Sequence, residues 1–465
     1  MSVAGLVDGV VGFVASIASR MTSWFDAQLL AAFAGFCLIV VAVVLSRARR
    51  RRNARVRAAR LEWGIHDLKQ KLRSRLAEPR QFCDSSAVAF PTLGASNAFE
   101  ADLEAAARSV MEQAGGKTAR AKHLLRKQLR GNGLNGSEAA YWRQLGALSL
   151  IDSTQEAVRA YARAADLAPD DPQAQMLAGV LYLRDGRLEA AEAAFRRQME
   201  LAGEGLEGAA IRCRAGVMLG DALIAREDPA SALEAYRAAR IEAETLVEKN
   251  PEVATFQREL SLVHDRIADV LLASGDTDKA LESYRCSLSV MQVLVKRDAV
   301  KPEWQRDLSV SHDRVGEMLE RKGDLDGALA SYREGLKIAQ TLAREHRDRA
   351  DLKWDLSSSH DRIGDVLSAK GRTTEALASY HRALELAEAA VEGSQSSLSW
   401  QRELAASYHK VGALEAQTGN DAEAIELLER GRAIIAQLDR IAEHRAQWRS
   451  DLRKFDQALE SMRLT

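Results

Sequence analysis

The chain has 465 residues, of which 46% are apolar and 28% charged, and it holds only 7 prolines. This composition excludes a disordered chain, and the low aromatic content of 5% argues against a β-sandwich or β-barrel, so it predicts an all-α protein. Residues 1–60 carry nine basic and two acidic side chains, whereas the remainder carries 56 basic and 64 acidic ones. The part beyond residue 60 therefore has a net charge of about −8.

Residues 1–26 read as an amphipathic N-terminal segment, interrupted by Asp8 and Gly9. On a helix, an apolar stripe that includes Leu6, Val10 and Phe13 faces away from a stripe of small residues. Such a segment either lies flat in the membrane interface or packs its small residues against another membrane helix. The sequence leaves both arrangements open.

An uncharged apolar segment spans residues 27–46 and reads AQLLAAFAGFCLIVVAVVLS. At a rise of about 1.5 Å per residue, a helix of this length crosses the ~30 Å hydrocarbon core of a bilayer, so we predict a single transmembrane helix. Eight arginines and no acid follow within residues 47–60, which is typical of the cytoplasmic side of a membrane helix. The residues expected to orient the helix are Arg47, Arg49, Arg50, Arg51 and Arg52. We expect anionic lipid, rather than nucleic acid, opposite this cluster.

Residues 47–137 are predicted as a basic juxtamembrane stalk and helical linker. Between Gly115 and Gly136 the linker holds six lysines and arginines and no acid. We expect a solvated basic helix face there, with contacts to the membrane, to an acidic partner or to acidic repeats as alternatives.

The chain carries no recognisable chemical motif. Its four cysteines form no CxxC pair, so they favour neither a disulfide framework nor a zinc site. Gly115, Gly116, Lys117 and Thr118 resemble the end of a phosphate-binding loop, but Met111 stands where that motif needs glycine. We therefore expect no catalytic residue, no metal site, no cofactor and no small-molecule substrate.

A period of 48 residues dominates the C-terminal half of the chain. Bulky apolar residues recur at this spacing at Phe256, Trp304, Leu352, Trp400 and Trp448. The next recurrent position is held by His264, His312, His360 and Tyr408. Glycines that mark a tight turn follow at Gly275, Gly323, Gly371 and Gly419. The pattern predicts helix–turn–helix units, in which the glycine ends the first helix and Asp276 or Asp324 caps the second.

These units resemble the tetratricopeptide repeat (TPR), and shorter units of the same pattern begin near Trp142 and Gly179. The resemblance covers residues 138–465 and implies an all-α solenoid, ended by a capping helix that starts near Trp448. Similar 48-residue units are found in bacterial multi-repeat proteins. The lysine and asparagine clamp by which some members of the family hold acidic peptide termini is not matched, so a cochaperone role is not expected.

The histidine–aspartate pairs that begin at His264, His312 and His360 recur in step with the repeat. A single active site needs one copy of its residues, so this recurrence indicates architecture. We expect half-buried histidines rather than catalytic or metal-binding ones.

The resemblance also implies that the fifth and ninth residues of each first helix line a concave groove that holds peptides. These positions are acidic here, at Asp265, Asp269, Asp313, Glu317, Asp361 and Asp365, and Asp221 adds a ninth-position acid upstream. Residues four apart share a helix face, so the carboxylates are predicted to form a ladder that binds a basic segment of a partner. The alternative is that they pair with Arg266, Arg314 and Arg362 and only join the units.

Together these features predict a membrane-anchored scaffold in the inner membrane of a bacterial cell, with a cytoplasmic solenoid that binds partner proteins. The alternative function is an assembly or regulatory subunit of a membrane complex, held through its transmembrane segment. An enzyme confined to residues 61–137 is a third hypothesis, which the small size of that stretch disfavours.

Overall fold

The structure is a computed structural model, and it describes residues 65–72, 93–108, 117–130, 137–297, 301–393, 398–441 and 446–463. The regular elements in these ranges are all helices, as the sequence predicts. In the first part of the chain they are α3 (Leu93–Ala106), α4 (Thr118–Arg130), α5 (Glu138–Ser149), α6 (Thr154–Leu167), α7 (Pro172–Asp185) and α8 (Leu188–Leu201). The later helices are α9 (Gly205–Ala225), α10 (Pro229–Lys249), α11 (Ala254–Ala273), α12 (Thr277–Arg297), α13 (Pro302–Arg321), α14 (Leu325–Glu345), α15 (Ala350–Ala369), α16 (Thr373–Gly393), α17 (Leu398–Gln417), α18 (Asp421–Ile441) and α19 (Ala446–Arg463).

None of the helices in these ranges is long and apolar enough to cross a membrane. Residues 1–26, the predicted transmembrane helix at 27–46 and the arginines from Arg47 to Arg52 lie outside the described residues. The membrane anchor and its orientation therefore stay predictions.

The chain divides into two compact units, one up to Ala194 and one from Phe195. In the first unit α5 packs against α6, α6 against α7, and α3 against both α5 and α7. Phe99 and Tyr161 are fully buried there, with their rings edge to face and the ring centroids 5.3 Å apart. The domain boundary predicted after residue 137 differs from this division and stays a prediction.

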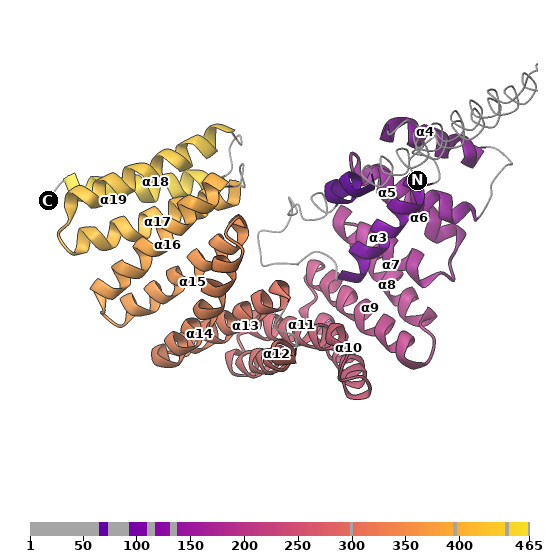
Figure 1. The fold of residues 1–465 in the computed structure, drawn as a ribbon, viewed down its shortest axis with the longest axis horizontal. Helices are drawn as coiled ribbons and strands as arrows, with labels where there is room; N and C mark the ends of the chain where they lie inside the picture. Colours follow the sequence, from indigo (N-terminus) through magenta and orange to yellow (C-terminus); the bar gives the residue numbers. More distant parts are fainter. Residues whose placement is uncertain are drawn as a thin grey trace, which may run out of the picture. The chain divides into compact units, whose positions relative to one another are not determined.

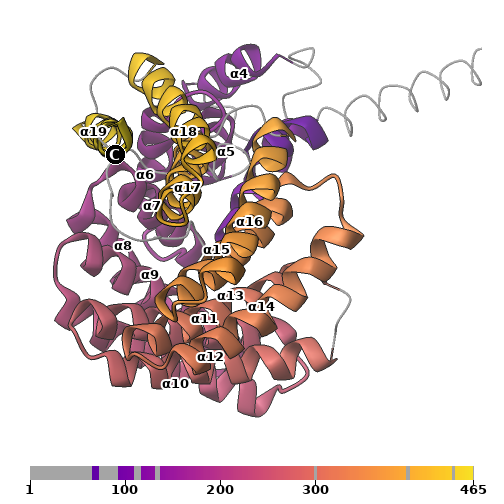
Figure 2. The ribbon, with the colours of Figure 1, turned by 90° about the vertical axis from the view of Figure 1, so that its left-hand side faces the viewer.

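The second unit is a series of antiparallel helix pairs (Figures 1 and 2). Helices α9 and α10, α11 and α12, α13 and α14, α15 and α16, and α17 and α18 form the pairs, and α19 packs on α18. The first helices of consecutive pairs begin 48 residues apart, at Ala254, Pro302, Ala350 and Leu398. Helix α19 begins at Ala446, in the same register, and is the last helix among the described residues.

Turn chemistry explains where the helices of each pair begin and end. Gly275 and Gly323 follow the first helices with φ of 84° and 80°, a left-handed conformation that glycine adopts without strain. The second helices begin at predicted caps, because the carboxylates of Asp276 and Asp324 accept hydrogen bonds from the backbone N–H three residues on. The predicted turns and caps are thus confirmed.

Close approach of the two helices explains the glycines inside the first helices. A Cβ added to Gly316 would lie 2.7 Å from the ring of Tyr332, and one added to Gly364 would lie 2.5 Å from the ring of Tyr380. Each tyrosine ring therefore fills the space that a side chain would take, and buried serines join the same helix pairs. Ser309 and Ser357 donate to backbone carbonyls of the partner helix at 3.0 and 2.6 Å.

Candidate functional site

The predicted fifth-position carboxylates lie at the junctions between consecutive helix pairs. Each contacts a cation of the next pair, 49 residues further along the chain. The contacts are Asp265 with Arg314 at 3.0 Å, Asp313 with Arg362 at 2.7 Å and Asp361 with Lys410 at 2.5 Å. The three aspartate side chains are 15, 10 and 25% exposed. They join neighbouring units, which is the alternative that the sequence left open beside ligand binding.

The predicted ninth-position carboxylates lie nearer the solvent. The side chains of Asp269, Glu317 and Asp365 are 39, 47 and 38% exposed. Asp269 and Asp365 accept hydrogen bonds from the hydroxyls of Tyr284 and Tyr380. Asp365 also pairs with Lys410 at 2.9 Å, and Glu317 pairs with an arginine one turn along its own helix. Each of these carboxylates therefore keeps a solvent-facing side.

Asp221 occupies a different environment, because its side chain is only 3% exposed. The hydroxyl of Tyr236 donates to its Oδ1 at 2.6 Å, and Nε of Arg266 lies 3.2 Å from the same oxygen. The Arg266 side chain is 8% exposed. This cluster joins α9, α10 and α11, so Asp221 holds helices together and does not face a ligand.

Burial has the largest influence on the pKa values of the fifth-position carboxylates. It raises the pKa of Asp265 and of Asp313 to about 6, against the opposing effect of Arg314 and Arg362. Burial also raises the pKa of Asp361, although a neighbouring lysine opposes the shift. The partner cations therefore compensate only part of the desolvation cost, and the pairs add little net stability.

A second series of ion pairs joins the same first helices nearer their N-terminal ends, and sequence reasoning missed it. Its members are Arg214 with Glu259 at 2.6 Å, Arg258 with Asp307 at 2.6 Å, Arg306 with Asp355 at 2.9 Å, and Arg402 with Asp451 at 2.7 Å. The signal was present in the recurring arginine–acid dipeptide of the QRE and QRD triplets. The dipeptide recurs at Arg258, Arg306 and Arg402, and the acid position continues at Asp355 and Asp451, so each of these three arginines meets an acid 49 residues further along the chain.

Trp354 interrupts this second series. Arginine stands at the matching positions of the other long units, Arg258, Arg306 and Arg402. The Trp354 ring instead stacks on Trp400, with the centroids 5.1 Å apart and the planes 2° from parallel. Its indole N–H donates to Glu403, the acid that an arginine would otherwise meet. The departure from the repeat thus places a half-buried aromatic ring at this point of the stack.

A pocket of about 380 Å³ lies beside this tryptophan and is lined mainly by α13 and α15. Val310 contributes an apolar side chain that is 41% exposed. The charged residues of its lining are Arg306, Arg314, Arg362, Asp313, Glu317 and Asp355. Arginines and carboxylates are therefore equal in number, so this part of the stack is electrically balanced. Arg314 and Arg362 are two of the arginines that the sequence offered as alternative partners of the acids, and Arg306 is a third that it did not.

The recurring histidines have the packing role that their periodicity predicts. Burial lowers the pKa of His264 to about 4 and also lowers the pKa of His312 and His360. His264 is buried, and the other two are half-buried. All three imidazoles are therefore neutral near pH 7.

In the first unit, the basic helix α4 is not simply solvated as the sequence suggests. Lys122 is only 7% exposed, and its ammonium group lies 2.8 Å from Asp152 and 3.1 Å from Glu156. Arg126 pairs with the same Glu156. Two of the predicted basic residues therefore bind α6 and the turn before it.

Comparisons with known proteins agree with this architecture. The tetratricopeptide repeat family models match residues 152–199 and 217–285, and again residues 359–390. No curated protein matches the sequence. Among solved structures, BtubC from P. vanneervenii is similar at 17% identity over 59% of this chain and 94% of that chain, with a TM-score of 0.40. The apo form of RapI is similar at 13% identity over 64% and 99% of the two chains, also with a TM-score of 0.40.

A third structure, a signal transduction ATPase with a tetratricopeptide repeat sensor from Pyrococcus horikoshii, is 13% identical over 74% of this chain and 52% of that chain, with a TM-score of 0.44. The family matches fall on the helix pairs α6 to α8, α9 to α12 and α15 to α16. The turn glycine Gly275 and the close contact of Gly364 with Tyr380, both described above, lie within these matches. Over residues 152–199, 217–285 and 359–390 the chain matches the tetratricopeptide repeat family.

Proposed function

We propose that this protein is a membrane-anchored scaffold whose helix pairs bind a segment of a partner protein at the pocket between α13 and α15. The observation that carries the proposal is the replacement of a repeat arginine by Trp354 beside exposed Val310. Half-buried aromatic side chains in concave sites are the residues that most often dominate protein binding. The scaffold role requires no catalytic residue.

The charges around the pocket refine the predicted preference for a basic segment. The fifth-position Asp313 is already paired with Arg362 and is 10% exposed, so it has little left to offer a ligand. Glu317 lines the same pocket and is 47% exposed. We therefore assign the contact with a basic side chain to Glu317, and to Asp269 in the neighbouring unit, whereas Asp365 is already paired with Lys410. The preferred segment carries an apolar residue next to a lysine or arginine.

Selection from a random-peptide library against the full-length chain in detergent tests this assignment. We expect enriched peptides to combine an apolar and a basic residue. Their affinity is expected to fall at least about tenfold in Trp354→Arg, which restores the residue found in the other units, and to fall less in Glu317→Gln.

The matched control is Asp326→Asn, which removes an acid of α14 that is 86% exposed and does not line the pocket. This variant is expected to bind the peptides as the wild type does. Equal affinity for wild type and Trp354→Arg would show that the pocket is not the binding site.

The membrane anchor in this proposal is supported by the sequence of residues 27–46 and the arginine cluster after it. We propose that the helix pairs face the cytoplasm from the inner membrane. The full-length chain is expected to stay in the membrane fraction after carbonate washing, and a variant lacking residues 1–60 is expected to be released. Full release of the complete chain would contradict the anchor.

The second candidate function is a subunit of a membrane complex held through the same segment, and it is favoured by the small-residue stripe within residues 1–26. Exchanging residues 1–46 for an unrelated single-pass segment separates the two. A scaffold keeps its peptide binding and its partner after the exchange, whereas a subunit held by helix packing loses its partner.

A further inference from the structure

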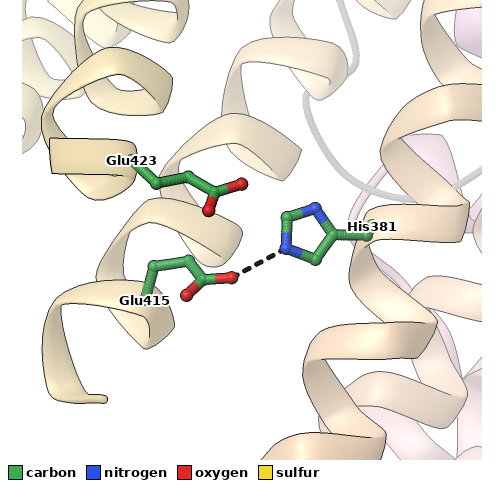
Figure 3. Close-up of side chains that lie close together, drawn as sticks. All are labelled: His381, Glu415 and Glu423. Atoms are coloured by element: carbon green, nitrogen blue, oxygen red, sulfur yellow. Dashed lines mark hydrogen bonds and ion pairs between the residues drawn. The ribbon is translucent and has the colours of Figure 1, made fainter. Parts of the chain in front are cut away.

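Three side chains that the sequence analysis did not consider meet where α16, α17 and α18 come together (Figure 3). Nε2 of His381 lies 2.8 Å from Oε1 of Glu415. Glu423 completes the group, and the ligand atoms of the three residues all lie within 4.8 Å of one another. Glu415 is buried, His381 is partly exposed and Glu423 is exposed, so the group is open to solvent on one side.

Comparison with the other long units shows that this group departs from the repeat. The residue at the Glu415 position is a buried leucine in each of them, at Leu271, Leu319 and Leu367. Glu415 is as deeply buried as these leucines, with 4% exposure. A carboxylate at a leucine position costs free energy unless its charge is compensated, so its presence calls for a partner of opposite charge.

The histidine is a second departure at the same junction. The position of His381 is occupied by arginine in the two preceding long units, at Arg285 and Arg333. An arginine would give the buried carboxylate a permanent cation, whereas a histidine gives it an imidazole that is also a common metal ligand. If this junction needed only an ion pair with Glu415, an arginine at position 381 would be enough.

The surroundings of Glu415 hold its carboxylate in one orientation. Asn420 Nδ2 donates to Oε2 at 2.6 Å, and the hydroxyl of Thr418 lies 3.4 Å from the same oxygen. The other carboxylate oxygen of Glu415, Oε1, faces His381. Such support of a ligand by neighbouring donors is typical of metal sites.

We propose that His381, Glu415 and Glu423 bind a divalent first-row transition-metal cation, for which Zn²⁺ is the probe. One imidazole nitrogen and two carboxylate oxygens are a ligand set that this class of cation accepts, with water in the remaining position. Metal–ligand distances of about 2.0–2.2 Å require the three atoms to draw together, and exposed Glu423 is the side chain with room to move. The bound ion would join three helices from two consecutive units.

Titration of Zn²⁺ into the full-length chain tests this proposal. The sample for this titration is made without a histidine tag and with Cys286→Ser, because the exposed Cys286 thiol would bind zinc by itself. We expect one saturable site and a rise in melting temperature. Glu415→Leu and His381→Arg are expected to weaken binding at least about 100-fold, and Glu423→Gln about tenfold, because the first two remove the best-held ligands.

The two strong variants carry residues that the other units hold at these positions, so both are expected to fold. Glu375→Gln is the matched control, because Glu375 occupies the Glu423 position of the preceding unit and is also exposed. Co²⁺ bound in place of zinc is expected to give the absorption of a nitrogen–oxygen site, lost in His381→Arg. Zinc binding that is unchanged in Glu415→Leu, or the absence of a saturable site, would overturn the proposal and leave only an ion pair between His381 and Glu415.

Discussion

Replacing Asp221 with leucine is expected to lower the free energy of unfolding of the surrounding helices by about 3–5 kcal/mol. The reason is that Arg266, only 8% exposed, would keep its charge in the core after losing the carboxylate 3.2 Å away. Tyr236 would lose the acceptor of its hydroxyl at the same time. Hydrogen exchange of α9 and α11, together with urea denaturation followed by circular dichroism, measures the loss.

A double variant isolates the buried charge as the cause. Adding Arg266→Met to Asp221→Leu removes the buried cation, for which exposed Asp269 at 3.7 Å compensates only in part, so most of the lost stability is expected to return. Asp278→Ala is the control, because that side chain is 80% exposed, and it is expected to leave exchange unchanged. If the double variant is no more stable than Asp221→Leu alone, lost packing and not the buried charge explains the effect.

The second large effect is expected from Phe455→Ala in the last helix, α19. Phe455 is 3% exposed and packs in a cluster with Leu428 and Ile435 of α18. Its ring also fills the space beside Gly431, where an added Cβ would lie 2.6 Å from it. Truncating a buried phenylalanine costs about 3–5 kcal/mol, because apolar contacts are lost and a cavity remains.

In a stack where each helix pair contacts only the neighbouring pairs, this loss of stability stays local. Exchange protection is expected to fall in α17, α18 and α19 and to stay unchanged in α11 and α13. Gln457→Ala, which removes an exposed side chain of the same helix, serves as the control. If exchange protection fell equally in all helices from α9 to α19, the nearest-neighbour description would be wrong.

The helix pairs could be predicted in detail because local chemistry determines them. Gly275 and Gly323 have the left-handed conformation that ends a helix, and Asp276 and Asp324 accept the predicted capping bonds. These features depend on residues within one turn of one another. The period of 48 residues then repeats the glycine in every long unit, at Gly371 and Gly419 as well.

The contacts of the acidic ladder could not be predicted in the same way. Helical periodicity places Asp265 and Asp269 on one face, but it does not say which residue of the next unit faces them. That depends on the angle at which consecutive pairs stack, which brings Arg314 to Asp265. The residues with the clearest signal, Trp354 and Glu415, are those that depart from the repeat, and only a position-by-position comparison of units finds them.

The ion pairs between units have an evolutionary consequence. The units that begin with α11, α13 and α15 each present a cation to the unit before and a carboxylate to the unit after, as Arg314 and Asp313 do for α13. A duplication or deletion of one whole unit by recombination would bring together the same kinds of partner that were joined before. The series of helix pairs can therefore gain or lose length in steps of one pair without new compensating substitutions.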